Sequence, residues 1–547
     1  MKFSSYIVAA AVIPACLASA AAEYQADVVV YGGTSGGVMA AVAAASQVKS
    51  VILIEPGNHL GGMTSGGLGQ VDTGREETIG GLTRQYFERV AASYQPRAPL
   101  YRVTPRAAEA MFDRMAAEAK VKVLKNSRLR EKDGVDKNGI RIERLTLENG
   151  DTVRGRVFID SSYEGDLMAR TGVSYAVGRE SRATYGESGA GVRQLRTLRT
   201  AFDDQGKLLP ELVRADPGKP GEGDRKVQAY NFRLCVTGDP ANRAPFPKPD
   251  NYNPDYYRNL LDSLTNSAGK NWKMTDFVSL GDLPQGKFDL NNKGWYSTDF
   301  VNASWSYPEG SYAERAKIHQ AHVDYVKGLL YFLGNDPRLP ESLRVDTARW
   351  GLAKDEFTDN VNFPAQLYIR EGRRLTGEYV MIQEDAYANA TKPDTVGMGS
   401  YMLDTHWCQK VLAPDGKVYL EGLMGHLPVR PYEISFRSMI PRRSECDNLL
   451  VSTALSASHV IYSSLRMEPV YMILGESAGI AAALAVAGDL PVAGVKVSEL
   501  QTILRKRGQI LNYPGGNIFP LLSEVPGLVK DNDAAEFKGK WSHSSST

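Results

Sequence analysis

The chain is poor in the residues that build disulfide frameworks and metal sites. Its 547 residues include only 4 cysteines and 7 histidines. No two cysteines have CxxC spacing, and no cysteine–histidine cluster has the spacing of zinc ligands. Cys16 lies in the N-terminal apolar segment, so Cys235, Cys408 and Cys446 allow one disulfide at most. We therefore expect no bound metal and a fold stabilised by its hydrophobic core.

The chain also lacks an excess of charge of either sign. Lys plus Arg total 64 and Asp plus Glu total 63. Binding to nucleic acid or to anionic lipid needs a basic field, which this balance does not supply. We therefore expect a small-molecule substrate and no nucleic-acid partner. No pattern in the sequence indicates an oligomeric state.

The N-terminal apolar run is too short to cross a membrane. Lys2 precedes an apolar stretch over residues 6–17, and small residues follow up to Ala22. A membrane-spanning helix needs about 20 apolar residues, whereas charged, apolar and small residues in this order form a secretory signal. We predict a signal peptide over residues 1–22, a secreted or periplasmic protein and no stable membrane insertion. A lipoprotein signal that uses Cys16 is the alternative, and Pro14 makes it a poor match.

Residues 26–54 have the pattern of a strand–helix–strand unit. The run of valines at residues 28–30 is typical of a strand buried on both faces of a parallel sheet. Glycines follow at once, residues 36–46 form an alanine-rich helical stretch, and residues 48–54 return to a buried strand. The sequence therefore predicts the βαβ unit that begins a dinucleotide-binding domain.

The rest of the chain divides by composition. Residues 178–439 are rich in Tyr, Trp, Asn and Pro, and the apolar strand–helix pattern returns only at residues 449–451 and 475–487. We predict an α/β fold in which a Rossmann-like domain is assembled from residues 24–177 and 440–525. An α+β substrate or cap domain over residues 178–439 is inserted into it, and residues 526–547 form a polar tail.

A glycine-rich turn joins the first strand to the first helix. A pyrophosphate binds at such a turn to backbone N–H groups and to the start of the helix. Measured against GxGxxG, Thr34 replaces the middle glycine, and its side chain either binds phosphate or tightens the turn. Glu55 ends the second strand, where a carboxylate accepts hydrogen bonds from ribose hydroxyls. The candidate residues of the turn are Gly32, Gly33, Thr34, Ser35, Gly36 and Gly37.

A second glycine-rich segment covers residues 61–69 and holds five glycines. Glycine lets the backbone approach a flat ligand closely. A domain that binds only NAD does not need this segment, and the interleaved methionine and leucine favour a shaped pocket wall. The candidate contacts are Gly61, Gly62, Met63, Gly67 and Leu68.

With these motifs the chain resembles the secreted FAD-dependent oxidoreductases, relatives of the glutathione-reductase-like flavoproteins with two dinucleotide motifs. The resemblance covers nearly all of the chain that follows the predicted signal. It extends over residues 158–167, 178–180, 368–374, 403–406, 458–459, 466–469 and 475–479. Some members are labelled xanthan lyase, and no residue pattern here supports lyase chemistry.

This resemblance implies FAD as the cofactor and assigns further contacts. It places Asp160 beside the adenosine half and points the start of a C-terminal helix at the flavin. A helix start stabilises a reduced, anionic flavin through its dipole. Glu476 stands where glutamine is more common, so its side chain should point away or be hydrogen-bonded. The helix residues implied are Gly475, Ser477, Ala478 and Gly479.

The histidines are the first candidates for moving the proton that accompanies flavin chemistry. His406 in the middle region and His459 after the strand at residues 449–451 are our candidates, with His426 left open. Arg373 is a candidate for binding a carboxylate or stabilising reduced flavin. The alternatives are buried structural histidines and a salt-bridged arginine.

The predicted function is an FAD-dependent oxidase or dehydrogenase. It transfers a hydride between an exported or extracellular small molecule and flavin N5, and a carbohydrate or polyol is the favoured substrate because tryptophans stack on sugar rings. The alternatives are a flavin-dependent, redox-neutral lyase or isomerase and a polymer-binding protein with structural FAD. The tryptophans of the middle region are Trp272, Trp295, Trp305, Trp350 and Trp407.

Overall fold

The computed structural model of the chain describes residues 21–193, 195–198, 200–265, 270–388 and 391–513. The predicted signal peptide lies almost wholly outside these residues, and the predicted tail over residues 526–547 lies wholly outside them. Both stay predictions. Cys235, Cys408 and Cys446 are described, and all three are buried free thiols.

A mixed sheet forms the centre of one lobe, and seven strands of it lie in the described parts of the chain. β1, β2, β3, β6 and β20 run parallel, while β5 and β4 add an antiparallel extension. Helix α1 (Ser35–Ala45) links the first two strands, so the predicted βαβ unit is confirmed. In spatial order the strands are β3 (Lys122–Leu124), β2 (Val51–Ile54), β1 (Glu23–Tyr31), β6 (Thr152–Asp160), β5 (Arg141–Thr146) and β4 (Val135–Asn138), with β20 (Leu449–Val451) beside β6.

The two faces of the sheet bury different sets of side chains. Successive residues of a strand point to opposite faces. In β1, Val28 and Val30 pack into the core that contains α1, whereas Val29 and Tyr31 pack into a second core with Phe158. Burial on both faces explains the unbroken apolar run that predicted a central parallel strand.

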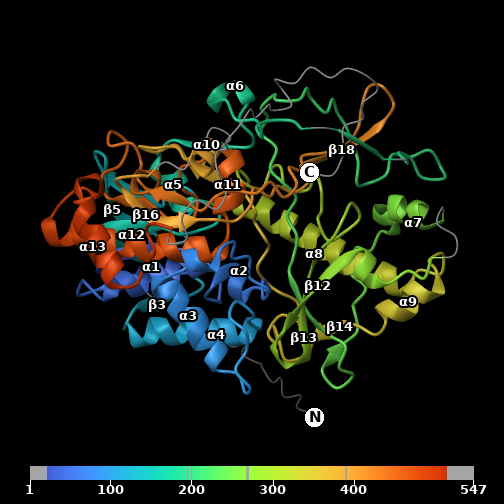
Figure 1. Ribbon diagram of the computed structural model, residues 1–547, viewed down its shortest axis with the longest axis horizontal. Coiled ribbons are helices and arrows are strands. Elements are labelled where there is room, and N and C mark those ends of the chain that lie inside the picture. The colour runs from blue at the N-terminus through green and yellow to red at the C-terminus, as the bar shows by residue number, and fades with distance from the viewer. Residues whose placement is uncertain (1–20, 194, 199, 266–269, 389–390, 514–547) are drawn as a thin grey trace, which may run out of the picture.

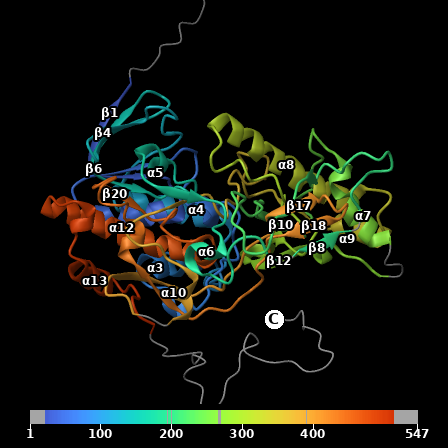
Figure 2. The ribbon, with the colours of Figure 1, turned by 90° about the horizontal axis from the view of Figure 1, so that it is seen from above.

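The C-terminal segment joins this sheet. Leu450 of β20 lies opposite Ile159 of β6, and helix α12 (Glu468–Gly488) packs along α1. Figures 1 and 2 show α12 beside the β1–β6 sheet, far from the opposite lobe. α12 is long and apolar enough to cross a membrane, but nearly all of its residues are buried, as in a core helix.

The contact between α1 and α12 depends on small residues. A Cβ atom on Gly475 would lie well under 3.0 Å from the carbonyl oxygen of Gly36, and one on Gly479 would lie as close to that of Ala40. The two backbones therefore approach each other more closely than larger side chains permit. Within α1 the alanines at 40, 41, 43 and 44 are all buried.

The opposite lobe is built from the middle of the chain (Figure 1). It contains α7 (Arg258–Thr265), α8 (Tyr312–Asn335) and α9 (Glu341–Thr347). The described residues form two sheets there. One has the order β11 (Arg243–Ala244), β14 (Gly351–Ala353), β10 (Leu234–Thr237), β13 (Lys287–Asn292) and β12 (Val278–Leu283), and the other β8 (Arg196–Leu198), β18 (Val418–Glu421), β17 (Gln409–Leu412) and β9 (Val213–Arg214).

The middle region is not confined to that lobe. β15 (Arg373–Leu375) pairs with β7 (Tyr175–Val177), and β16 (Thr395–Gly399) pairs with β19 (Tyr432–Ser435) while it packs on α12. Elements from within residues 178–439 thus cover the dinucleotide lobe as well. The remaining helices are α2 (Gly62–Ser65), α3 (Gly81–Ala92), α4 (Pro105–Glu118), α5 (Asp166–Thr171), α6 (Arg182–Tyr185), α10 (Gln383–Tyr387), α11 (His459–Leu465) and α13 (Val497–Lys506).

We predict that Gly479→Ala lowers the free energy of unfolding by about 1–3 kcal/mol, because the added methyl group would press on the carbonyl of Ala40. Gly334→Ala is the matched control, since its Cβ would meet no atom closer than 3.4 Å. The control should be neutral or slightly stabilising, as alanine favours a helix interior over glycine. Denaturant unfolding of both variants measures the difference, and equal stabilities would contradict the close helix contact.

Candidate cofactor cavity and active site

The turn between β1 and α1 is fixed by contacts that only glycine permits. Gly32 has a φ of +96°, and a Cβ on it would lie 2.7 Å from the backbone nitrogen of Ser162. A Cβ on Gly37 would collide with the carbonyl of Gly32. Thr34 caps α1, since its Oγ1 accepts a hydrogen bond from Gly37 N (3.1 Å) and donates one to Ser161 O (2.8 Å). Thr34 therefore tightens the turn, which is one of the two roles that the sequence left open.

Glu55 closes the same turn from the end of β2. Its carboxylate accepts hydrogen bonds from Gly33 N at 2.7 Å and from Gly57 N at 2.5 Å. Burial raises the pKa of Glu55 to about 7. The carboxylate faces the cavity described next, where it is available to ribose hydroxyls as the sequence predicted.

A cavity of about 420 Å³ lies over the turn. Gly32, Thr34, Glu55 and Ser162 line it on the side of the sheet. Tyr312, Arg315 and His319 of α8 line it from the other lobe. Sequence reasoning missed these α8 residues, because an amphipathic helix in a region without a dinucleotide pattern gives no signal of a cofactor wall.

Asp166, which lines this cavity together with Arg315, is surrounded by arginines. Asp166 forms ion pairs with Arg170, Arg315 and Arg373 at 2.8–2.9 Å. Burial opposes the ionisation of Asp166, but these guanidinium groups hold its pKa at about 2. Glu309 also pairs with Arg373, and the buried Glu164 interacts with Arg315, so acids balance this group of arginines.

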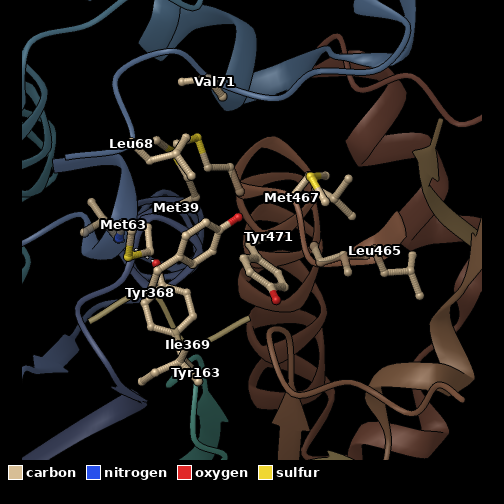
Figure 3. Packing of buried hydrophobic residues seen from close by; sticks show 14 of the residues in the cluster. Met39, Met63, Leu68, Val71, Tyr163, Tyr368, Ile369, Leu465, Met467 and Tyr471 are labelled. Carbon is tan, nitrogen blue, oxygen red and sulfur yellow. Dashed lines mark hydrogen bonds between the residues drawn. The ribbon is translucent and has the colours of Figure 1, made fainter. Parts of the chain in front are cut away.

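The start of α12 meets both glycine-rich segments at Glu468. Its carboxylate accepts hydrogen bonds from Ser35 (2.6 Å), Thr64 (2.8 Å) and the hydroxyl of Tyr163 (2.7 Å). In Figure 3, Met63 and Leu68 from the second segment lie near Tyr163, Tyr368 and Tyr471 of α12. Glu468 thus joins α1, α2 and the loop after β6 at one point.

The structure corrects the expected start of the C-terminal helix. α12 begins at Glu468, so Gly475, Ser477, Ala478 and Gly479 lie inside the helix and do not form its N-terminus. The two glycines permit the contact with α1, and Ser477 Oγ donates to Val396 O (2.7 Å). Glu476 points away from the glycine-rich turn, as expected, and accepts hydrogen bonds from Leu82 N and Arg507 Nε.

Asp160 and most of the second glycine segment, which the sequence predicted to contact the cofactor, instead contact other parts of the protein. Asp160 is fully buried behind the cavity, where its carboxylate accepts hydrogen bonds from Ser162 and from Met168 N. It shapes the loop after β6 and does not line the cavity. In the second glycine segment Gly62 lines the cavity, whereas Gly67 leaves room for the carbonyl of Arg233, and Met63 and Leu68 belong to the hydrophobic core.

His406 lies in a network of buried charges. Its Nδ1 lies 2.7 Å from Asp299 Oδ2, and Asp299 also pairs with Arg370 at 2.9 Å. Burial and Arg370 lower the pKa of His406 below its ordinary value of 6.5. The imidazole side chain keeps 14% of its surface exposed, whereas Asp299 keeps 2%. His406 is therefore a neutral, accessible base held by a buried carboxylate.

A chain of contacts connects His406 to the glycine-rich segments. Asp404 Oδ2 lies 3.8 Å from His406 Nε2, and Arg466 Nη2 donates to the carbonyl of Asp404 at 2.9 Å. Arg466 stands two residues before Glu468, the first residue of α12. This places His406 next to the region between α12 and the second glycine segment.

His459 and Arg373 are not placed to contact a substrate. The side chain of His459 is 1% exposed, and its Nδ1 lies 2.8 Å from the carboxylate of Glu371. Arg373 is held by Asp166 and Glu309, both at 2.9 Å, and it does not line the cavity. The sequence proposed both residues as catalytic, but in the structure each side chain pairs with a buried or partly buried carboxylate.

The residues that hold His406 were mostly missed. Arg370 and Glu371 belong to residues 368–374, where sequence reasoning considered Arg370, Arg373 and Arg374 and favoured Arg373. Gln228 joins the two histidines, because its Oε1 accepts from His406 N (3.0 Å) and its Nε2 donates to Glu371 (3.0 Å). Asp299 and Gln228 lie in no motif, so only the tertiary structure shows them. Within the parts of the chain that the structure describes, no group of three His, Cys, Asp or Glu residues has the arrangement of a metal site.

The fold and the cavity define a dinucleotide-binding protein of the Rossmann class. The first turn of α1 has no acidic residue, and Glu55 offers an acceptor for ribose hydroxyls. The residues present therefore fit the ADP half of a dinucleotide. A family model described as "FAD dependent oxidoreductase" matches residues 27–504. The chain belongs to this family, and it is an FAD-dependent oxidoreductase with FAD as its cofactor.

Comparison with the curated proteins finds no match. Among solved structures, a flavin monooxygenase mutant from Stenotrophomonas maltophilia is 17% identical, covering 31% of this chain and 45% of its own, with a TM-score of 0.20. THI4 from Thermovibrio ammonificans is 17% identical over 29% of this chain and 67% of its own (TM-score 0.22). L-proline dehydrogenase from P. horikoshii is 13% identical over 33% of this chain and 26% of its own (TM-score 0.18).

We predict that Glu55→Arg weakens FAD binding tenfold or more, because it removes the ribose acceptor and the partner of Gly33 N. A hydrogen bond to a charged group contributes about 1.5–3 kcal/mol. Titration of the apoprotein with FAD measures the affinity, and Glu77→Arg, at an exposed position, is the control. An unchanged affinity in a folded Glu55→Arg protein would place the cofactor elsewhere.

We also predict that Tyr312→Ala on α8 weakens FAD binding, because its ring forms part of the wall that the other lobe contributes. Tyr312 lies between Arg128 and Arg170, with ring-to-guanidinium distances of 4.7 and 4.8 Å. The matched control is Lys317→Ala, an exposed residue of the same helix. Equal FAD affinities for the two variants would show that the dinucleotide lobe binds the cofactor alone.

Proposed function

We propose that this enzyme oxidises an alcohol carbon of a small, uncharged, polyhydroxylated molecule, a carbohydrate or polyol, with His406 as the base. Bound FAD supplies the acceptor of the hydride, at N5. The observation that carries the proposal is the contact between His406 Nδ1 and Asp299, at 2.7 Å, in a network that reaches the start of α12. The alcohol carbon loses a hydride and its hydroxyl loses a proton, which gives a carbonyl product.

His406 is suited to accept that proton. Because Nδ1 lies against a carboxylate, we assign the Nδ1–H tautomer, which leaves the lone pair on Nε2. Burial opposes the ionisation of Asp299, but Arg370 and His406 lower its pKa, so the carboxylate stays charged. It then stabilises the imidazolium that forms when Nε2 takes the hydroxyl proton.

The charges around His406 favour an uncharged substrate. Each arginine near it has an aspartate partner: Arg370 pairs with Asp299, Arg466 with Asp404, and Arg233 with Asp289. A site in which the charges cancel has no free cation to bind an acid. Carboxylates at the edge of such a site accept hydrogen bonds from hydroxyl groups.

The tryptophans support the sugar assignment less than the sequence implied. Trp272 stacks on Phe277, and Trp350 packs edge-on against Phe288, so both serve the core of the second lobe. Trp407 is buried at 4% exposure. The assignment therefore depends on the charge balance. We also propose that the enzyme acts outside the cytoplasm, on the strength of the signal pattern at residues 1–22.

We predict that His406→Ala keeps its FAD but slows flavin reduction by about 100-fold, the usual scale of general base catalysis. The parent rate should fall only below pH 6.5, because the base must be neutral and its pKa lies below the ordinary value. Anaerobic stopped-flow mixing with neutral sugars and polyols, followed over pH, measures both effects.

His426→Ala tests the histidine that the sequence left open, whose side chain is 72% exposed and whose Nε2 lies 3.8 Å from Asp404 Oδ1. It should reduce its flavin at the parent rate and with the parent pH profile. If His406→Ala reduces its flavin at the parent rate, His406 is not the base. Turnover of a sugar without lasting bleaching of the flavin would instead support a redox-neutral lyase or isomerase.

A further inference from the structure

His59 lies between two acidic side chains that come from different lobes. Its Nδ1 lies 2.9 Å from Glu109 Oε1 of α4, and its Nε2 lies 2.9 Å from Asp359 Oδ2, in the loop that follows β14. α4 belongs to the dinucleotide lobe and β14 to the second lobe (Figure 1). One imidazole ring therefore connects the two lobes.

The two contacts together require the charged form of His59. A neutral imidazole has one N–H donor and one lone pair, whereas an ionised carboxylate only accepts hydrogen bonds. An imidazolium donates to both acids, but a neutral ring would set a lone pair against one of them. In agreement with this geometry, the hydrogen bond with Glu109 raises the pKa of His59 above its ordinary value of 6.5.

His59 stands where the cofactor cavity meets the solvent. It lines the cavity, as do Thr34 and Ser162 at the glycine-rich turn, which are buried. Gly57 and Asn58, which precede His59 in the chain, also line the cavity, but they are exposed. The mouth of the cavity is therefore beside His59.

The loop that carries Asp359 is fixed by other contacts. Glu356 is buried and accepts a hydrogen bond from Arg106 N at the start of α4 (2.8 Å), and Asn362 Nδ2 donates to Glu356 O (3.0 Å). Among the described residues, the side chain of Asp359 forms no ion pair besides the one with His59. The loop thus presents Asp359 to His59 from a defined position.

A second ion pair joins the lobes on the inner side of the cavity. Arg315 of α8 lies 2.9 Å from Asp166, and their side chains are 7% and 8% exposed, whereas those of His59 and Asp359 are 36% and 52% exposed. Breaking a buried pair leaves an uncompensated charge, but an exposed pair opens at little cost. The lobes therefore separate most easily at His59.

We infer that His59 acts as a clasp: as an imidazolium between Glu109 and Asp359, it holds the two lobes together at the mouth of the cofactor cavity and slows both the entry and the release of FAD. Asp359 itself does not line the cavity. Replacing it therefore opens the clasp without removing a contact to the cofactor. The inference depends on the position of the cofactor cavity and not on the proposed oxidation of a polyol.

The test variant is Asp359→Asn, which removes the charge that pairs with His59. Its rate constants for FAD entry and release should both rise about two- to fivefold, the scale of an exposed ion pair, and its Kd should change by less than about twofold. Exchange of bound FAD for isotopically labelled FAD gives the release rate. Mixing the apoprotein with FAD and following flavin fluorescence gives the entry rate.

The matched control is Asp282→Asn, at an exposed position of β12 in the same lobe. It should enter and release FAD at the parent rates, and thermal unfolding shows that each variant is folded. A double-mutant cycle isolates the contact itself. Adding Asp359→Asn to His59→Ala should not increase the release rate further, because the partner of Asp359 is already gone.

The effect should also depend on pH. The charged groups that face His59 are Glu109 of α4, Asp359 of the loop, Lys125 after β3 and Glu55 at the end of β2. The acceleration by Asp359→Asn should be complete at about pH 6 and absent at about pH 9, because His59 loses its proton as the pH rises through its raised pKa. Glu55 titrates in parent and variant alike, so the ratio of their release rates reports on His59.

Four results would overturn the inference: parent rates in Asp359→Asn, a loss of FAD affinity with an unchanged entry rate, an equal acceleration in Asp282→Asn, or a parent protein that does not exchange its FAD. The position of the cavity is tested separately by Glu55→Arg. Weaker FAD binding in that variant, together with parent rates in Asp359→Asn, would support the cavity and contradict the clasp.

Discussion

The close approach of α1 and α12 is the contact on which the site depends. Glycine and alanine on both helices let their backbones meet, with Gly36 against Gly475 and Ala40 against Gly479. This contact brings a C-terminal helix to the N-terminal glycine-rich turn. It also fixes the residues just before that helix, so Glu468 reaches Ser35 and Thr64 while Arg466 reaches Asp404. One helix packing thereby positions both the cofactor turn and the neighbourhood of His406.

Residues 368–374 organise the buried charges. Arg370 pairs with Asp299, which holds His406, and Glu371 contacts His459, Gln228 and Arg374. Breaking one buried pair leaves an uncompensated charge and costs about 3–5 kcal/mol. Such pairs fix one arrangement of side chains, and here that arrangement holds the imidazole of His406 in a defined orientation.

The cofactor cavity is shared between the lobes. The sheet lobe supplies the glycine-rich turn and Glu55, and α8 of the second lobe supplies Tyr312 and Arg315. Asp166 ties the lobes together, because Arg315 of α8 and Arg170 of α5 both bind its carboxylate. A cofactor bound between two lobes contributes its contacts to holding them together, so cofactor binding and the geometry around His406 are linked.

The sequence by itself determined the local elements of the dinucleotide lobe. The valine run of β1, the glycine-rich turn and Glu55 at the end of β2 each follow from short-range rules of periodicity, backbone freedom and hydrogen bonding, and all three lie where the pattern predicted. The sequence also predicted that the C-terminal segment returns to the first sheet, because a short apolar strand and an alanine-rich helix need a partner to bury them. The pairing of β20 with β6 confirms this prediction.

Only the tertiary structure decided which polar residues work together. Asp299 and Gln228 come from distant segments and carry no motif, because the partner of a polar side chain is set by packing and not by spacing along the chain. The same reason explains the misplaced residues: Arg373 and His459 looked available in the sequence, but nearby carboxylates occupy them. The start of α12 was placed too late, because the family resemblance put Gly475 at the start of the helix. In the structure the helix begins at Glu468, and the absence of a side chain at Gly475 permits the close packing on α1.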